Sequence, residues 1–531
     1  MPRLSEFVQS TNDALNRALL LTCECGITNL RNNRMQLTSN RMANELVEGR
    51  FVTVRIEGVT VLPAAGAHAV SPVDIVCADG RITAIEPCTA APSRSLLAMP
   101  ALVNAHDHAR PLSPTSFGGA AKPLETWLLR LGAMPAVDPY LAALAAFGRA
   151  ARGGAGSVMA HYTRFMGPMS AVDEAREVAR AAADIGIRLT FAVFMRDRNP
   201  LVYGPADPVL NLLSVNARDT ITAQFLSPMP HPQEQIERVE AIAAAIEGPM
   251  ISVQFGPNGP QWCSDDLLRA IADASIRTGR RVHMHLLETR YQRAFADRTY
   301  PHGIAAHLEA LGLMSPRLAL AHCVHVAPTD LDIIARSGAI IATNPSSNLH
   351  LRSGIAPVAD AIRRGCRVAL GVDASAFDED DDILREMRLG HFLHGGWGFD
   401  ETISREAWLE AVVANGRIAN GVAGSGALQV GEPADILVLD LARLDRDDVL
   451  PVGSADLVFA RATAAYIDQL WIAGRPVVRD GKLARVDLEA SHRALREAYR
   501  GKMASRQSYL QAWRELEPAV AEYYRRELGC C

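Results

Sequence analysis

Eight short apolar runs lie between about residues 100 and 424, and alanine-rich segments with helical periodicity separate them. The runs are Leu97–Ala105, Ser157–His161, Arg188–Phe194, Met250–Phe255, Arg281–Leu286, Arg317–His322, Ala339–Thr343 and Arg367–Val372. Strands that alternate with helices are typical of a parallel sheet covered by helices. Eight consecutive units favour a closed (β/α)8 barrel of the TIM type over residues 101–424, although the pattern alone also allows a doubly wound open sheet.

Short β-branched runs flank this region on both sides. They are Val52–Ile56, Asp74–Cys77 and Arg81–Ile85 before it, and Asp435–Leu439, Tyr466–Ile472 and Pro476–Arg479 after it. Asp-Gly pairs at residues 79–80 and 480–481 favour tight hairpin turns within these groups. We therefore predict that residues 51–100 and 425–487 build one composite β-sandwich domain beside the barrel.

The two ends of the chain differ in character from the rest. Residues 1–50 are polar and carry no motif, which predicts a poorly ordered N-terminal extension or an oligomer arm. Residues 488–531 predict a C-terminal helical tail whose apolar face packs on the body of the protein. Pro518 is expected to break that helix, because proline lacks the backbone N–H that a helix interior requires.

Composition and charge narrow the functional class. Hydrophobic residues make up 49% of the 531 residues, charged residues 21%, and the formal net charge is −5. Without a long basic run, this balance argues against a nucleic-acid or anionic-membrane partner. No apolar stretch is long enough to span a membrane and no secretion signal is evident, so we expect a cytoplasmic protein with a small-molecule substrate. The nine cysteines lack zinc-site spacing and fit a reducing compartment. A homo-oligomer, dimer or higher, is also expected.

Candidate metal ligands stand where the predicted barrel strands end. His106 and His108 close the first run, and residues two apart on a strand point the same way. His285 ends the fifth run, His322 the sixth, and Asp373 follows the eighth. The carboxyl ends of barrel strands meet at one catalytic face, where imidazole and carboxylate groups can share a metal ion. The spacing therefore predicts a metal centre at this face.

Several segments resemble the amidohydrolase superfamily, in particular its mononuclear aminohydrolase branch of cytosine, guanine and S-adenosylhomocysteine deaminases and triazine hydrolases. The matching segments are 100–108, 285–289, 321–325, 344–349, 353–358 and 370–373, and the resemblance covers most of residues 51–485. It implies a barrel with a β-sandwich flank and one divalent ion held by His106, His108, His285 and Asp373. Zinc is the first choice, with iron or manganese as alternatives.

The resemblance also implies roles in catalysis. Asp373 would take the proton of the attacking water, His322 would steady the resulting hydroxide, and Glu288 would hand a proton to a ring nitrogen. Binuclear relatives bridge two ions with a carboxylated lysine on the fourth strand. The only lysines here are Lys122, Lys482 and Lys502, and none is near that strand, which excludes a lysine-bridged pair.

Other polar residues near these motifs receive structural interpretations. His283 is expected to alternate away from the barrel interior, and His325 to lie past the end of its strand, so neither is assigned as a ligand. The acidic run Asp378–Asp382 is expected to cap and solvate the next helix.

The substrate prediction depends on departures from the family pattern. Asn258, followed by Trp262, stands where deaminating relatives usually carry a substrate-contacting histidine, which puts a standard nucleobase or adenosine in doubt. In the family the loop containing Asn344 and Asn348 borders the substrate.

Arg164, Arg196 and Arg198 follow the second and third strands, where a guanidinium could bind a substrate carboxylate through two parallel hydrogen bonds.

These observations predict a metal-dependent hydrolase that breaks a C–N bond in a small, anionic heterocycle and releases ammonia. Hydrolytic ring opening is an alternative, as is expulsion of an amine, sulfur or chloride leaving group. A different class of function is a catalytically inactive barrel that serves as a binding protein. The intact ligand set and Glu288 count against that last interpretation.

Overall fold

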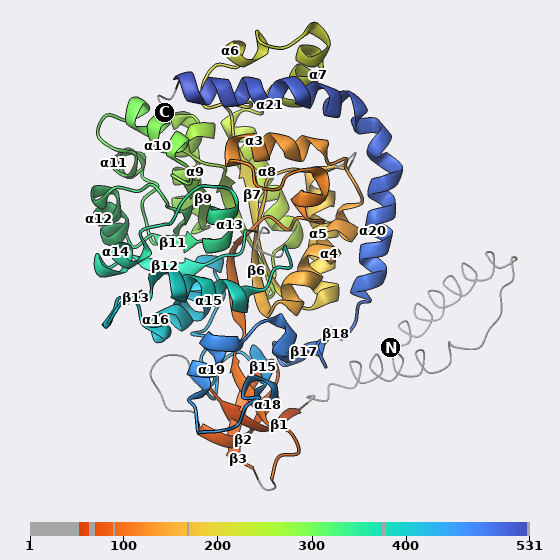
Figure 1. Cartoon of the computed structure of the whole chain (residues 1–531), viewed down its shortest axis with the longest axis vertical. Helices are drawn as coiled ribbons and strands as arrows, with labels where there is room; N and C mark the ends of the chain where they lie inside the picture. Colours follow the sequence, from red (N-terminus) through yellow and green to blue (C-terminus); the bar gives the residue numbers. More distant parts are fainter. Residues whose placement is uncertain (1–52, 63–69, 89–90, 167–168, 374–378, 528–531) are drawn as a thin grey trace, which may run out of the picture. The chain divides into compact units, whose positions relative to one another are not determined.

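The computed structural model describes residues 53–62, 70–88, 91–166, 169–373 and 379–527 (Figure 1). Within these ranges the chain from Thr53 onward forms one compact unit. The extension predicted at residues 1–50 lies outside the described residues.

A barrel of eight parallel strands forms the centre of the unit, as predicted. In chain order the strands are β5 (Leu102–Asp107), β6 (Ala155–Tyr162), β7 (Arg188–Met195), β8 (Ile251–Pro257), β9 (Val282–Leu286), β10 (Leu318–His322), β11 (Ile340–Thr343) and β12 (Arg367–Leu370). Each strand pairs in parallel with the next. Past the end of β12, the amides of Val372 and Asp373 donate to the carbonyl of His106 and bring the last strand back to the first.

The first predicted run, Leu97–Ala105, is divided between two sheets. Its first half is β4 (Leu96–Pro100), which pairs with flanking strands, and its second half is β5 of the barrel. Both halves are fully buried, which is why they appear as one apolar run in the sequence. The chain changes sheets at Ala101, whose amide donates to the carbonyl of Asp435.

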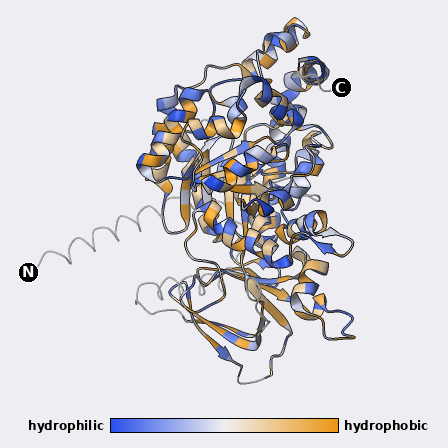
Figure 2. Ribbon diagram, turned by 90° about the vertical axis from the view of Figure 1, so that its left-hand side faces the viewer, coloured by the Kyte–Doolittle hydropathy of each residue, from blue (hydrophilic) through white to orange (hydrophobic). Residues whose placement is uncertain are grey.

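Helices follow the barrel strands along the chain, and most of them surround the barrel (Figures 1 and 2). They are α3 (Leu124–Arg130), α4 (Pro139–Arg152), α5 (Ala171–Ile185), α6 (Asp207–Leu210), α7 (Val215–Phe225), α8 (Pro232–Ile246), α9 (Asp265–Thr278), α10 (Arg290–Thr299), α11 (Ile304–Ala310), α12 (Pro328–Ser337), α13 (Pro345–His350), α14 (Val358–Arg363), α15 (Ile383–His394), α16 (Arg405–Glu410) and α17 (Gly416–Asn420). Side chains of Ser170, Ser264 and Thr289 cap α5, α9 and α10. Asp382 caps α15 as predicted for the acidic run, whereas Asp378 lies outside the described residues.

The flanking β domain combines strands from both sides of the barrel, as expected, and its strands are hydrogen-bonded into one eight-stranded sheet. The order across this sheet is β18 (Lys482–Leu483), β17 (Arg475–Arg479), β16 (Ile467–Ile472), β15 (Ile436–Asp440), β4, β1 (Val54–Val61), β2 (Val70–Ala78) and β3 (Arg81–Pro87). Both predicted Asp-Gly turns have positive φ at each residue, which a tight hairpin turn requires. Helices α18 (Leu441–Leu444) and α19 (Ser454–Arg461) lie between β15 and β16.

The C-terminal tail is helical, but Pro518 does not end its second helix. The tail comprises α20 (Leu488–Lys502) and α21 (Gln507–Glu527), and Pro518 lies inside α21. Trp513, Leu516 and Val520 are buried on either side of the proline, so packing on the barrel outweighs the lost helical hydrogen bond. As Figure 1 shows, α21 crosses the same end of the unit as α3, α6 and α7, all of which it contacts.

None of the helices in the described ranges combines the length and apolar character needed to cross a bilayer.

Candidate active site

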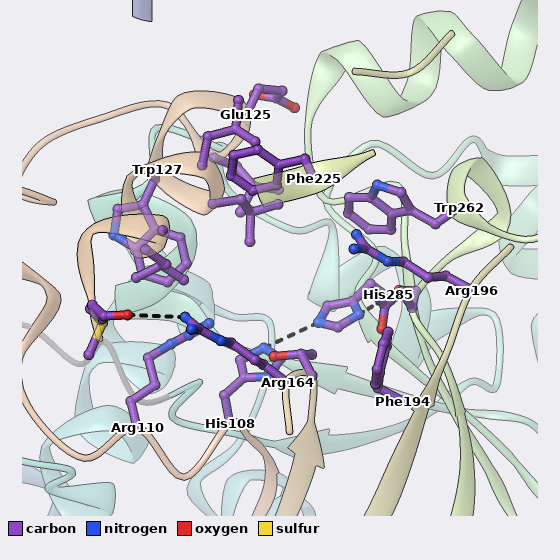
Figure 3. Close-up of a pocket in the computed structure, with 18 of the residues that line it drawn as sticks. His108, Arg110, Glu125, Trp127, Arg164, Phe194, Arg196, Phe225, Trp262 and His285 are labelled. Carbon is purple, nitrogen blue, oxygen red and sulfur yellow. Dashed lines mark hydrogen bonds between the residues drawn. The ribbon is translucent and has the colours of Figure 1, made fainter. Parts of the chain in front are cut away.

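A cavity of about 480 Å³ opens where the barrel strands end. Residues that follow β5, β6, β7, β8, β9 and β12 line it, as expected for the catalytic face of a barrel. We call His106, His108, His285, Glu288, His322 and Asp373 the cavity floor. We call Arg110, Glu125, Trp127, Tyr203 and Tyr524 the cavity roof. Figure 3 shows His108 and His285 on the floor, with Glu125 and Trp127 across the cavity from them.

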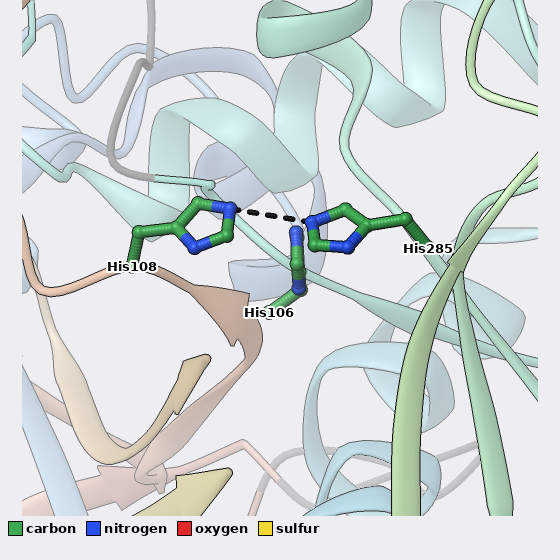
Figure 4. Close-up of side chains that lie close together, drawn as sticks. All are labelled: His106, His108 and His285. Carbon is green, nitrogen blue, oxygen red and sulfur yellow. Dashed lines mark hydrogen bonds between the residues drawn. The ribbon is translucent and has the colours of Figure 1, made fainter. Parts of the chain in front are cut away.

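The four predicted metal ligands converge at the floor (Figure 4 shows the three histidines). Asp373 Oδ1 lies 3.4 Å from His106 Nε2 and 3.1 Å from His108 Nε2. The Nε2 atoms of His108 and His285 are 3.3 Å apart. In a tetrahedral zinc centre with bonds of about 2.0–2.1 Å, neighbouring ligand atoms are about 3.3 Å apart. These three separations therefore match those of ligand atoms that share one metal ion.

The other ring nitrogen of each histidine fixes its orientation. Nδ1 of His108 donates to the carbonyl of His161 at 2.8 Å, and Nδ1 of His285 donates to the carbonyl of Asn258 at 2.6 Å. These contacts orient both rings so that their Nε2 atoms point at the shared position, which is the usual outer support of a metal-bound imidazole.

The expectation that His283 points away from the barrel was wrong. His283 and His285 are two residues apart on β9, so both side chains face the interior. His283 Nε2 lies 2.9 Å from Nδ1 of His106 and supports that ligand in the way backbone carbonyls support the other two. His325, by contrast, bonds to the carbonyl of Ser353.

The chemistry of the donor set fits a divalent ion. His106 Nε2 is buried and has no hydrogen-bond partner. Burial lowers the pKa of His106 to about 3, so its imidazole is neutral, the form that binds metals. A buried, neutral nitrogen without a partner at the centre of a ligand cluster is accounted for by a bound cation.

Where several strands end, the backbone adopts an uncommon conformation that places these groups. Leu287, His322 and Asp373 have φ angles of 48°, 72° and 58°, in the left-handed region that non-glycine residues seldom adopt. Such positions cluster at functional sites, where surrounding contacts outweigh the strain. Ser347 stabilises Asp373 by donating to its Oδ2 at 2.6 Å, which turns Oδ1 toward the histidines.

Asn344 and Asn348 contact His322 and are not among the residues that line the cavity. Asn348 Oδ1 lies 2.9 Å from His322 Nδ1, and Asn344 Nδ2 lies 3.3 Å from the same nitrogen. The shorter contact assigns the ring proton to Nδ1, so Nε2 of His322 can accept a hydrogen bond. Both asparagines are buried, which gives them a supporting role beneath the floor instead of the predicted substrate contact.

Glu288 lies beside His322 on the floor. Its Oε2 is 3.6 Å from His322 Nε2, while its Oε1 is buried without a partner. Burial, together with the nearby charges of Asp373 and Glu125, raises the pKa of Glu288 well above its usual value. A carboxyl group that stays protonated near neutral pH can act as a general acid.

Two of the three predicted arginines line the cavity. Arg164 donates to the carbonyl of Met134 at 3.2 Å, and the guanidinium of Arg196 lies 5.8 Å from the ring centre of Phe194. Arg198 instead donates to the carbonyl of Pro260 and to the Tyr300 hydroxyl, and it lies outside the lining. These neutral groups hold the Arg198 side chain behind the cavity wall, so Arg198 is not placed to bind a substrate carboxylate.

Asn258 and Trp262 both line the cavity, where the substrate prediction placed them. Asn258 Oδ1 is buried without a hydrogen-bond partner. It can therefore accept a hydrogen bond from a bound molecule.

The roof was not predicted from the sequence. Arg110 stacks on Trp127, with 4.6 Å from its guanidinium carbon to the ring centre. Its position two residues beyond His108 was a signal for a cavity contact. Tyr203 and Tyr524 belong to a loop and to the tail helix, and no motif marks them.

Comparisons with known proteins agree with this geometry. The chain matches the profile of the amidohydrolase family over residues 97–477. A 5-methylthioadenosine/S-adenosylhomocysteine deaminase of Desulforudis audaxviator is 30% identical over 466 residues, which cover 84% of this chain and 97% of the relative. Another deaminase of that description aligns over 58% of its own length.

Two solved structures share the fold. An adenosine deaminase from Xanthomonas campestris with bound zinc has a TM-score of 0.69 and 24% identity, covering 85% of this chain and 98% of that one. An atrazine chlorohydrolase mutant from Arthrobacter aurescens, complexed with zinc and atraton, has a TM-score of 0.71 and 20% identity, covering 84% and 99%.

Proposed function

Because this chain belongs to the amidohydrolase family, a family of hydrolases acting on C–N bonds, we propose that it deaminates a small heterocycle bearing an anionic group. The observation that carries the proposal is the floor: Asp373 lies 3.4 Å from His106 and 3.1 Å from His108, His108 lies 3.3 Å from His285, and burial raises the pKa of the neighbouring Glu288 well above its usual value. Such a combination can activate water and protonate a ring nitrogen of the substrate within one cavity.

His106, His108, His285 and Asp373 would hold a single divalent ion, with zinc the first choice and iron or manganese the alternatives. When bound, such an ion lowers the pKa of water toward neutrality and polarises the reacting bond.

The chain's own residues then move the protons. Asp373 accepts one proton from the attacking water, and His322 Nε2 accepts a hydrogen bond from the other O–H, which keeps the oxygen in line with the reacting carbon. Glu288 donates its proton to the adjacent ring nitrogen as the oxygen–carbon bond forms. Asp373 returns its proton to the amino group, which leaves as ammonia, while the remaining hydroxyl proton passes to Glu288 and restores it. Each group is thus regenerated within one turnover.

Cationic side chains in the cavity support an anionic substrate. Among the described residues, Arg110, Arg164 and Arg196 line the cavity without an ion pair to any carboxylate. Unpaired guanidinium groups beside a cavity favour a carboxylate ligand, which they bind through charge-assisted hydrogen bonds. Asn258 and Trp262 would contact the ring itself.

A turnover screen tests this function. Full-length protein loaded with zinc would receive aminated pyrimidines, purines and triazines, each as a carboxylic acid and as its amide, while ammonia and ring absorbance are recorded together. We expect ammonia release with an intact ring and a preference for the acids. Loss of ring absorbance without ammonia would indicate ring opening, and appearance of chloride or thiol would indicate another leaving group. A protein that binds metal but turns over none of the panel would support the non-catalytic alternative.

A further inference from the structure

Glu125, on α3, is a buried carboxyl group that the proposed reaction does not use. It lines the cavity, yet only 5% of its surface is exposed. Its Oε1 accepts hydrogen bonds from Thr289 Oγ1 at 2.5 Å and from Tyr203 Oη at 3.2 Å. Its Oε2 is buried and has no partner. A buried carboxylate oxygen without a donor is costly, so a donor supplied by a bound molecule would stabilise it.

The tail helix α21 bonds to the backbone of Tyr203, the residue whose hydroxyl donates to Glu125. Tyr524 Oη accepts the backbone N–H of Tyr203 at 3.2 Å, and Tyr523 Oη donates to the carbonyl of Tyr203 at 3.3 Å. The rings of Tyr203 and Tyr524 also pack edge to face, with 5.3 Å between their centres. Tyr523 and Tyr524 both belong to α21, which follows the region matched by the family profile. The loop after β7 is therefore fastened to α21 at the residue that contacts Glu125.

A shared hydrogen-bond network connects this part of the roof to the floor. Gln292 Nε2 donates to Tyr203 Oη at 3.4 Å, and Gln292 Oε1 accepts the backbone N–H of Glu288 at 2.8 Å. Thr289, which donates to Glu125, directly follows Glu288 in the chain. The position of Glu125 is thus fixed relative to the reacting end of the cavity.

We propose that Glu125 recognises a hydrogen-bond donor, an amine or a hydroxyl, on the part of the substrate remote from the reacting carbon, and that α21 positions Glu125 through Tyr203. The inference rests on the proposed function and narrows its substrate class to heterocyclic acids that also carry such a donor. Burial raises the pKa of Glu125 to about 7, so at neutral pH a donor meets a carboxyl that is ionised in part of the molecules.

Three matched cytosine acids test the recognition: 3-(cytosin-1-yl)propanoate and its 2-hydroxy and 2-amino derivatives. All three carry the carboxylate, and only the last two carry the donor. Wild-type enzyme is expected to prefer the donor-bearing acids by about 10- to 100-fold in kcat/KM, the effect of one hydrogen bond to a charged group. The same comparison with adenine in place of cytosine covers larger rings. Equal kcat/KM for all three acids in the wild type would overturn the inference, and this arm needs no variant.

Glu125→Gln sharpens the comparison. Thr289 and Tyr203 both donate to Oε1, so the glutamine oxygen would stay with them and its NH2 group would take the position of the unpartnered Oε2. A donor would then meet a donor, and the preference for the hydroxy and amino acids should disappear. Glu174→Gln is the control, because Glu174 is also buried and accepts a tyrosine hydroxyl, from Tyr162, but does not line the cavity. A preference that survives Glu125→Gln would overturn the assignment.

Tyr524→Phe tests the role of α21. It removes the acceptor of the Tyr203 amide, so it should reduce the preference ratio through KM more than through kcat. An unchanged ratio would overturn the positioning role. Because a variant can fail to fold, calorimetric binding of the corresponding uracil acids to the zinc-loaded wild type gives a second measure of the same preference. If none of the acids in the wider panel of pyrimidines, purines and triazines is turned over and no uracil acid binds, the proposed function fails and this inference with it; turnover without donor preference overturns this inference alone.

Discussion

The floor and the roof of the cavity are held in place by different kinds of contact. On the floor, His108 and His285 are fixed by backbone carbonyls of neighbouring strands, so their positions follow from the barrel itself. On the roof, side chains make the supporting contacts: Tyr203 and Thr289 donate to the carboxyl of Glu125, and the Tyr524 hydroxyl accepts the backbone N–H of Tyr203. The roof can therefore change with its loops and tail while the reaction chemistry stays the same.

Loss of a metal ligand should have the largest effect and would test the floor directly. His106→Ala is expected to abolish both metal binding and turnover, because it removes one of four donors. Elemental analysis and ammonia release on the same preparation measure the two losses. His307→Ala is the control, since His307 pairs with Asp265 away from the cavity. Two tightly bound ions per active wild-type chain would contradict the single-ion floor.

Glu288→Gln should give the next largest effect. The variant keeps the metal but cannot donate a proton, and general acid catalysis contributes about 10²- to 10⁴-fold. For the wild type, burial raises the pKa of Glu288, so activity should be present at lower pH and fall as pH rises through that value. The falling limb of the kcat/KM profile should be absent from the residual activity of the variant. An unimpaired variant at saturating substrate would remove Glu288 from the mechanism, and exposed Glu309→Gln serves as the control.

The third effect concerns the support beneath the floor. His283→Leu removes the acceptor for His106 Nδ1 and should weaken metal affinity by about 10- to 100-fold, the usual effect of losing an outer hydrogen bond to a ligand. His283→Gln can restore an acceptor and should recover part of the affinity. Competition with a chelator followed by elemental analysis provides the measurement. Equal affinity in all three proteins would show that His106 needs no such support.

Changes at the cavity arginines should have the smallest effect and act on binding. Arg164→Gln and Arg196→Gln are each expected to lower kcat/KM for a carboxylic acid substrate by about tenfold, mainly through KM, while the amide is affected less. Arg198→Gln is the matched control, because Arg198 lies outside the lining. If acid and amide respond alike in every variant, the cavity does not select an anion.

The difference between floor and roof also explains which parts of the fold and the site could be predicted from the sequence. Seven of the eight barrel strands were predicted within a few residues, because each is a short apolar run bounded by helical periodicity, whereas the first predicted run joined a strand of the flanking sheet to the barrel strand β5. The floor followed from the same pattern, since His106, His285 and His322 lie on those strands and Asp373 lies three residues past the last. Strand geometry carries side chains to a known place, so position along the run predicts position in space.

No strand pattern predicts where the roof residues lie. Glu125, Tyr203 and Tyr524 are separated by long stretches of chain, and only loop and helix packing brings them together. The same limit explains two errors. Packing of Trp513, Leu516 and Val520 keeps α21 continuous through Pro518, and the sequence contains no measure of that packing. Arg198 follows β7 as Arg196 does, but local contacts with Pro260 and Tyr300 turn it away.

The placement of α21 has a bearing on how the substrate range of this enzyme can evolve or be engineered. Within the described residues, α21 follows every strand of both sheets, so residues can be exchanged, inserted or deleted in it without shifting the register of any barrel strand. Yet it supplies Tyr524 to the cavity and fastens the loop that carries Tyr203. A library confined to this one helix would therefore explore new specificities in a background whose catalytic groups are never mutated.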